Sequence, residues 1–301
     1  ITKGKSGCVQ ADYFMERSGI MRYEGAFLSE ADGLSISTAA MIPDQKPYRA
    51  VVQLVHGMSE HKERYFPFME YLAGLGYLVV IHDHRGHGKS VKAVEDLGYT
   101  YGGGAQAMRR DIGTVNRRLK AKYPDLPLIL MGHSMGSLAV RAFAAKHDSC
   151  MDMLIVCGSP SYNAAWPLGV AIAKTEKALF GPHHRSKLIE TLSFGSSVLK
   201  FRKDKNCTAW ICSDPQVARE YEDSQLCGFT FTDDGYLALF ELMRQAYDVF
   251  FLHKSVYAGA VYQRSRGSLP DRCEAFCQNC KGNAQGWIQG CKGKALSGNA
   301  S

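Results

Sequence analysis

Short apolar segments alternate with amphipathic ones along the first 160 residues of the chain. Four apolar segments predict buried strands, and they lie at residues 50–55, 78–81, 128–131 and 153–157. Three segments with apolar residues at helical spacing predict helices, and they lie at residues 65–73, 102–123 and 138–146. Residues 24–40 carry a Gly-containing turn between apolar stretches, which predicts an antiparallel hairpin. This order predicts an α/β fold, with a mostly parallel sheet covered on both faces by helices.

Residues 160–230 break the alternation with Pro, Gly, Trp and mixed charge. We interpret them as an insertion, here called the cap, over the C-terminal edge of the sheet, where such folds bind ligands. The core then comprises residues 1–159 and 231–248. Residues 249–301 form an atypical tail, whose composition is rich in Cys and basic residues.

Composition and charge exclude some classes of function but do not identify one. The chain has 46% hydrophobic and 22% charged residues and a net charge of +7, as expected of a soluble globular protein. The tail holds seven Lys/Arg and two Asp/Glu, so +5 of the +7 lies there, and the nearly neutral body argues against a nucleic-acid partner. No apolar run is long enough to cross a bilayer, and the N-terminus lacks a secretory signal, so we expect a cytoplasmic protein.

The pentapeptide Gly132-His133-Ser134-Met135-Gly136 is the clearest chemical motif in the sequence. It lies between a predicted strand and a predicted helix, which is the context of the nucleophile elbow of serine hydrolases. Small residues at both ends let the backbone turn sharply and expose the Ser134 hydroxyl. We therefore predict Ser134 as the catalytic nucleophile and the amide of Met135 as one donor to an oxyanion.

Two further motifs follow the predicted strands at residues 50–55 and 78–81. In His56-Gly57-Met58-Ser59-Glu60-His61, the glycine lets the backbone face the same oxyanion, so the Met58 amide is the second predicted donor. For His56 and His61 we favour a structural or surface role over proton transfer. The segment DHRGHGKS, at residues 83–90, lacks the spacing of a phosphate-binding loop, and we expect it to tie loops together beneath the site.

The segments VQLVHGMSEH, VVIHDHRGHGKS and LILMGHSMGS, in this order, resemble the monoacylglycerol lipase and lysophospholipase branch of the α/β-hydrolases, the serine aminopeptidase S33 family. The resemblance covers about residues 25–247. It implies an α/β-hydrolase fold and hydrolysis of carboxylic esters of lipid-like substrates through an acyl-enzyme on Ser134. It implies no cofactor, no metal and at most transient contact with a membrane surface, and it leaves the oligomeric state open. A peptidase with the same machinery is the alternative enzyme.

The family's catalytic acid and histidine have no counterpart in the tail, where no His follows His253. We do not assign the general base to His147, His183 or His184 either. The catalytic acid and the general base therefore stay unassigned. The chain as written could therefore be a catalytically impaired remnant, and loss of the last core strands predicts poor solubility.

Three interpretations of the tail remain open. Cys273, Cys277, Cys280 and Cys291 could form a metal clip, or the tail could be a disordered basic extension. In the third, the reading frame has slipped within residues 245–261. Plausible codons for the tail, read one base later, give SGAEDP and KLYPGMR, which resemble the missing family segments. The intended Asp would then straddle the codons of Gly267 and Ser268, and the intended His would begin within that of Ser301.

Overall fold

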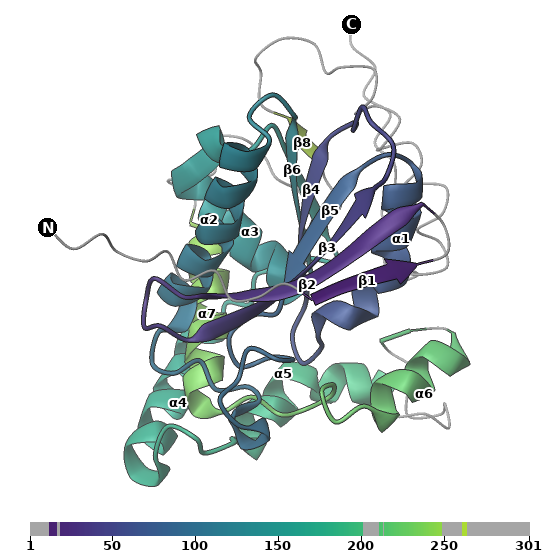
Figure 1. Cartoon of the computed structure of the whole chain (residues 1–301). Coiled ribbons are helices and arrows are strands. Elements are labelled where there is room, and N and C mark those ends of the chain that lie inside the picture. The colour runs from purple at the N-terminus through teal and green to yellow at the C-terminus, as the bar shows by residue number, and fades with distance from the viewer. Residues whose placement is uncertain (1–11, 17–18, 201–210, 213, 249–260, 264–301) are drawn as a thin grey trace, which may run out of the picture.

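An eight-stranded sheet forms the centre of the protein in a computed structural model (Figure 1). The structure describes residues 12–16, 19–200, 211–212, 214–248 and 261–263. The strands are β1 (Asp12–Glu16), β2 (Ile20–Leu28), β3 (Ser35–Pro43), β4 (Val51–Val55), β5 (Leu78–His82), β6 (Leu128–His133), β7 (Met153–Cys157) and β8 (Val261–Gln263). The α-helices are α1 (Phe66–Gly74), α2 (Gly104–Lys122), α3 (Met135–His147), α4 (Trp166–Phe180), α5 (Lys187–Lys200), α6 (Pro215–Asp223) and α7 (Asp233–Ala246).

The sheet has the order β1-β2-β3-β5-β4-β6-β7-β8. Strands β5, β4, β6 and β7 run parallel, and β1, β2 and β3 extend the sheet as an antiparallel meander. The predicted hairpin at residues 24–40 is the β2–β3 pair, and the predicted parallel strands are β4 to β7. Within the predicted tail, β8 pairs antiparallel with β7. Other predictions about the tail, including those at Gly267, Ser268 and Ser301, fall outside the described residues.

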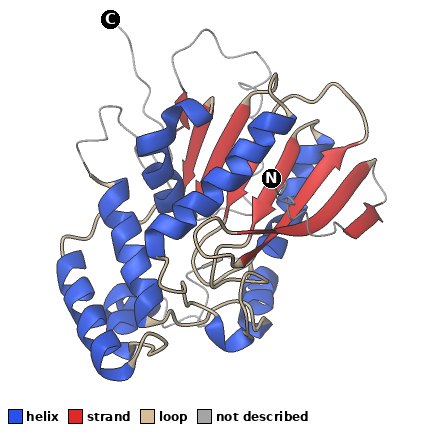
Figure 2. Cartoon of the chain, turned by 60° about the vertical axis from the view of Figure 1, so that its left-hand side comes forward, coloured by secondary structure: helices blue, strands red, loops and turns tan. Residues whose placement is uncertain are grey.

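Helices cover both faces of the sheet (Figures 1 and 2). Apolar residues of α2, α3 and α7 pack on one face, where Leu130, Ile112, Leu138 and Phe240 share one buried cluster. On the other face α1 contributes Leu72 to a second cluster. All five residues of β4 are buried, as a central parallel strand requires. These observations confirm the predicted α/β-hydrolase fold.

The region predicted as the cap contains α4, α5 and α6, which lie at one end of the sheet in Figure 1. Helix α4 packs closely on α7, because Gly169 leaves room for the ring of Phe240; a Cβ at this position would lie 2.6 Å from the ring. Leu168, Leu179 and Phe180 of α4 are exposed. Within the described residues, no helix combines the length and the apolar character needed to cross a membrane.

Candidate active site

Ser134 occupies a strained turn between β6, which ends at His133, and α3, which begins at Met135. Its backbone has φ 52° and ψ −120°, a conformation that costs a non-glycine residue ~1–3 kcal/mol. The Ser134 amide donates a hydrogen bond of 2.9 Å to the carbonyl of Cys157 on the neighbouring strand. The side chain is partly exposed, while most of the first turn of α3 is buried. This geometry is that of a nucleophile elbow.

The two glycines of the motif have no space for a side chain. A Cβ on Gly132 would lie 2.4 Å from the carbonyl oxygen of Gly136. A Cβ on Gly136 would lie 2.2 Å from the carbonyl oxygen of Val55 at the end of β4. The glycines thus bring β4, β6 and α3 into direct backbone contact, and this contact fixes the position of Ser134.

The loop after β4 lies against the elbow. A Cβ on Gly57 would come within 3.2 Å of the Ser134 Cβ, so this loop and the nucleophile are neighbours. Met58 follows Gly57 directly, and Met135 is the first residue of α3, whose first-turn amides have no acceptor within the helix. The structure therefore brings the residues that carry both predicted oxyanion donors to the same place as Ser134.

Glu60 holds that loop in position, a role that the sequence analysis did not predict. Its carboxylate accepts hydrogen bonds from the Gly57 amide at 2.5 Å and the Tyr65 hydroxyl at 2.9 Å, and pairs with Arg64. His133 lies beside this group, with Nδ1 3.1 Å from the Tyr65 hydroxyl. Burial alone would raise the pKa of Glu60, but His133 and Arg64 hold it well below its usual range. The anchor is therefore a buried, ionised carboxylate.

His56 and His61 both have partners of their own. Nδ1 of His56 lies 2.8 Å from the Gly57 carbonyl, and its Nε2 accepts a hydrogen bond from the His84 amide. Burial lowers the pKa of His56 well below its usual value. His61 pairs with Glu63 at 2.7 Å; burial works against its protonation, but hydrogen bonds with Cys227 and Glu63 raise its pKa to about 9. These contacts match the structural roles favoured from the sequence.

The segment at residues 83–90 links neighbouring loops, in agreement with its expected role. Asp83 accepts hydrogen bonds from the Lys62 amide, the Lys62 ammonium group and the Lys89 amide. The fully buried Arg85 donates to Asp111 at 3.0 Å and to Asp32 at 2.8 Å. These ion pairs join the loop after β5 to α2 and to the β2–β3 turn.

Within the part of the chain that the structure describes, no histidine hydrogen-bonds the Ser134 hydroxyl. The rings of His147 and His183 pack at a tilt against those of Phe143 and Tyr99, respectively. His184 pairs with Asp233 at 2.9 Å. None of the three acts on Ser134, which agrees with their omission as candidate bases.

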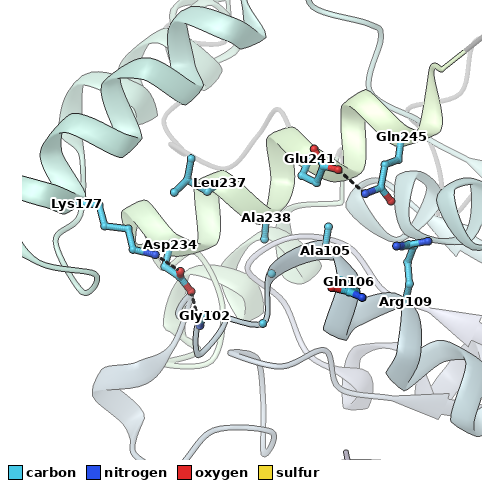
Figure 3. Close-up of a pocket in the computed structure, with 12 residues that line it drawn as sticks. Gly102, Ala105, Gln106, Arg109, Lys177, Asp234, Leu237, Ala238, Glu241 and Gln245 are labelled. Carbon is cyan, nitrogen blue, oxygen red and sulfur yellow. Dashed lines mark hydrogen bonds and ion pairs between the residues drawn. The ribbon is translucent and has the colours of Figure 1, made fainter. Parts of the chain in front are cut away.

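A hollow of about 410 Å³ lies between α7 and the start of α2 (Figure 3). Its wall combines apolar residues with the charged residues Arg109, Lys177, Asp234 and Glu241. None of its lining residues belongs to the elbow or to residues 56–61, so it is separate from the predicted ester site.

Comparison with known proteins identifies the family. The family model described as serine aminopeptidase, S33 matches residues 46–250, more than half of the chain. A monoacylglycerol lipase of Mycolicibacterium smegmatis is 33% identical over 47% of this chain and 49% of its own, and the mouse monoglyceride lipase is 32% identical over 43% and 41%. The chain thus spans about half the length of the curated relatives it matches.

A solved structure supports the same assignment. A thermostable carboxyl esterase from Bacillus coagulans superimposes with a TM-score of 0.67 at 26% identity, over 74% of this chain and 72% of its own. Together with the sheet order and the elbow geometry, these similarities show that the chain belongs to the serine aminopeptidase S33 family of α/β-hydrolases.

Proposed function

We propose that this protein is a serine hydrolase that cleaves carboxylic esters of lipid-like substrates, such as a monoacylglycerol or a lysophospholipid. The observation that carries the proposal is the strained, partly exposed Ser134 at the junction of β6 and α3. The names of the relatives, two monoacylglycerol lipases and a carboxyl esterase, support the substrate class. We place this activity in the cytoplasm.

In the proposed reaction the Ser134 Oγ attacks the ester carbonyl carbon, and its proton passes to a general base. The negative charge that develops on the carbonyl oxygen is held by the amides of Met58 and Met135. The protonated base donates this proton to the alcohol oxygen as the C–O bond breaks, and an ester on Ser134 remains. Water then hydrolyses that ester to the free acid and the enzyme. The proposed steps use groups of the protein, the substrate and water, without a cofactor.

The segment at residues 160–230 is proposed to act as a cap that receives the acyl chain. Exposed Leu168, Leu179 and Phe180 on α4 give this segment an apolar surface. The same surface could touch a membrane briefly while a lipid is transferred.

The general base and its acid partner are proposed to be encoded in the shifted reading frame of the tail. Sequencing the locus tests this directly: the DNA must yield SGAEDP when read one base after the frame of residues 262–280. A DNA sequence that cannot yield this segment excludes the frame slip and favours the metal clip or the basic extension.

A peptidase is the second candidate function, because the matching family model is described as a serine aminopeptidase. Hydrolysis of a monoacylglycerol and of an aminoacyl anilide should be compared, with Ser134→Ala as the control. Ester cleavage that Ser134→Ala abolishes supports the proposal, whereas anilide cleavage alone favours the peptidase. If neither substrate is cleaved, the chain as written is the impaired remnant.

A further inference from the structure

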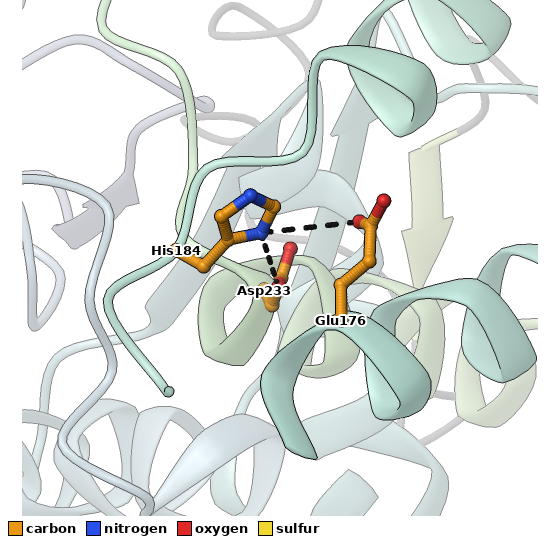
Figure 4. A group of neighbouring side chains, drawn as sticks. All are labelled: Glu176, His184 and Asp233. Carbon is orange, nitrogen blue, oxygen red and sulfur yellow. Dashed lines mark hydrogen bonds and ion pairs between the residues drawn. The ribbon is translucent and has the colours of Figure 1, made fainter. Parts of the chain in front are cut away.

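Three side chains from the cap and the core meet at the start of α7 (Figure 4). Glu176 belongs to α4, His184 to the segment after α4, and Asp233 is the first residue of α7. Nδ1 of His184 lies 2.9 Å from Asp233 Oδ2 and 4.0 Å from Glu176 Oε2, and both carboxylates point toward it. One potential ligand atom from each residue lies within 4.8 Å of the other two, so the group is compact enough to share one ion.

Two buried carboxylate oxygens in this group lack a hydrogen-bond donor among the described residues. The Asp233 side chain is 0% exposed; the Ser186 backbone contributes a hydrogen bond to its carboxylate, but its Oδ1 has no partner. The Glu176 side chain is 22% exposed, but its Oε2 atom is buried and also has no partner. An unsatisfied buried polar group is costly. Two carboxylates also face a single imidazole, so even a protonated His184 would leave an excess negative charge. The group therefore calls for a further positive charge.

The neighbouring residue Asp234 shows what a satisfied acid in this helix turn looks like. Its carboxylate accepts hydrogen bonds from the Thr100 hydroxyl at 2.6 Å, the Gly102 amide at 3.1 Å and the Lys177 ammonium group at 2.6 Å. The helix N-terminus favours a negative charge at both Asp233 and Asp234. It explains neither the unpartnered Oδ1 of Asp233 nor the approach of Glu176 from a different helix.

We propose that Glu176, His184 and Asp233 bind one divalent transition-metal ion, with Zn²⁺ the best fit and water as the fourth ligand. One imidazole with two carboxylates is a ligand set that Zn²⁺ accepts, whereas Ca²⁺ and Mg²⁺ prefer oxygen ligands alone. Tetrahedral bonds of about 2.0–2.1 Å place ligand atoms about 3.3 Å apart. The carboxylate oxygens now lie 2.9 and 4.0 Å from His184 Nδ1, and all three ligand atoms lie within 4.8 Å of one another, so side-chain shifts of up to about 1.5 Å would close the site.

Binding replaces the hydrogen bond between His184 and Asp233 with two metal bonds. Nδ1 of His184 must offer its lone pair, so any proton on that atom is released to solvent. The ion would join α4 and the following segment of the cap to α7 of the core. It would thus fix the cap on the core, a role that does not depend on the proposed esterase activity.

The test is a Zn²⁺ titration of the full chain by calorimetry after treatment with EDTA. Because thiolates also bind zinc, the titration uses a chain in which the tail cysteines are replaced by serine, at Cys273, Cys277, Cys280 and Cys291. We expect one ion per chain and a melting temperature that rises on binding. His184→Ala and Glu176→Gln should each weaken binding at least about tenfold, since even changes behind the ligands have effects of this size.

His183→Ala is the matched control, because this neighbouring histidine pairs with Asp96 and should leave zinc affinity unchanged. Absorption of bound Co²⁺ should show visible bands without a thiolate charge-transfer band. If the serine background does not fold, His184→Ala in the wild-type chain should lower the stoichiometry by one ion. Lack of stoichiometric binding, or equal affinity in His184→Ala and its parent, would overturn the proposal.

Discussion

Replacing Gly136 with alanine tests whether close backbone contact builds the elbow. The new Cβ would lie 2.2 Å from the Val55 carbonyl oxygen and 2.4 Å from that of His56, whereas ordinary contacts begin at 3.4 Å. Both oxygens belong to the main chain, so neither can rotate away, and the β4 end or α3 must shift by about 1 Å. Overpacking of this kind costs up to about 3 kcal/mol, and alanine regains about 1 kcal/mol of helix propensity. We therefore expect Gly136→Ala to lose about 2 kcal/mol of stability.

Thermal unfolding followed by circular dichroism measures this loss. For a chain of 301 residues, about 2 kcal/mol should lower the melting temperature by about 3 °C. Gly74→Ala, in the last turn of α1, is the matched control, because a Cβ there meets no heavy atom within 4 Å. It should melt at or slightly above the wild-type temperature. If both variants melt alike, the backbone contact at Gly136 does not constrain the elbow and the reasoning is wrong.

Three further predictions concern buried charge, pH and solubility. Arg85→Met should lower the free energy of unfolding in urea by about 3–5 kcal/mol, because it leaves the buried Asp111 carboxylate without its cationic partner. Arg117→Met breaks an exposed ion pair with Glu30 and should lower it by less than about 1 kcal/mol. Equal losses in the two variants would refute this. Burial lowers the pKa of His82 to about 4, so the unfolded state takes up this proton first and stability falls as the pH drops from about 6.5 to 4. His82→Leu should reduce that slope by about 1.4 kcal/mol per pH unit, and an unchanged slope in urea unfolding at several pH values would contradict it. The chain as written should be poorly soluble, and a soluble, cooperatively melting monomer in analytical ultracentrifugation and calorimetry would show otherwise.

The sequence predicts best those features that depend on neighbouring residues. Strands β4 to β7 follow from short apolar runs, and the elbow follows from five consecutive residues, since the turn needs glycine at both ends. Helix α3 begins at Met135, three residues before the predicted start, because the apolar pattern does not register the turn that Ser134 closes.

Features that combine distant residues could not be predicted in this way. Glu60 meets His133 only after β4 and β6 pair, and Asp234 reaches Thr100 across 134 residues. The pairing of His184 with Asp233 likewise needs the contact of α4 with α7. Glu60 lies two residues after Met58 in the sequence, but no neighbouring residue indicated that its carboxylate would accept a hydrogen bond from the Gly57 amide.

Covalent labelling with a fluorophosphonate, followed by peptide mass spectrometry, tests the central claim that Ser134 is the nucleophile. The elbow and the two amides are present without an assigned base, so we predict slow labelling confined to the peptide that carries Ser134. Ser134→Ala should abolish it. Labelling of another residue, undiminished labelling of Ser134→Ala, or no labelling of the wild-type chain after prolonged exposure would contradict the assignment.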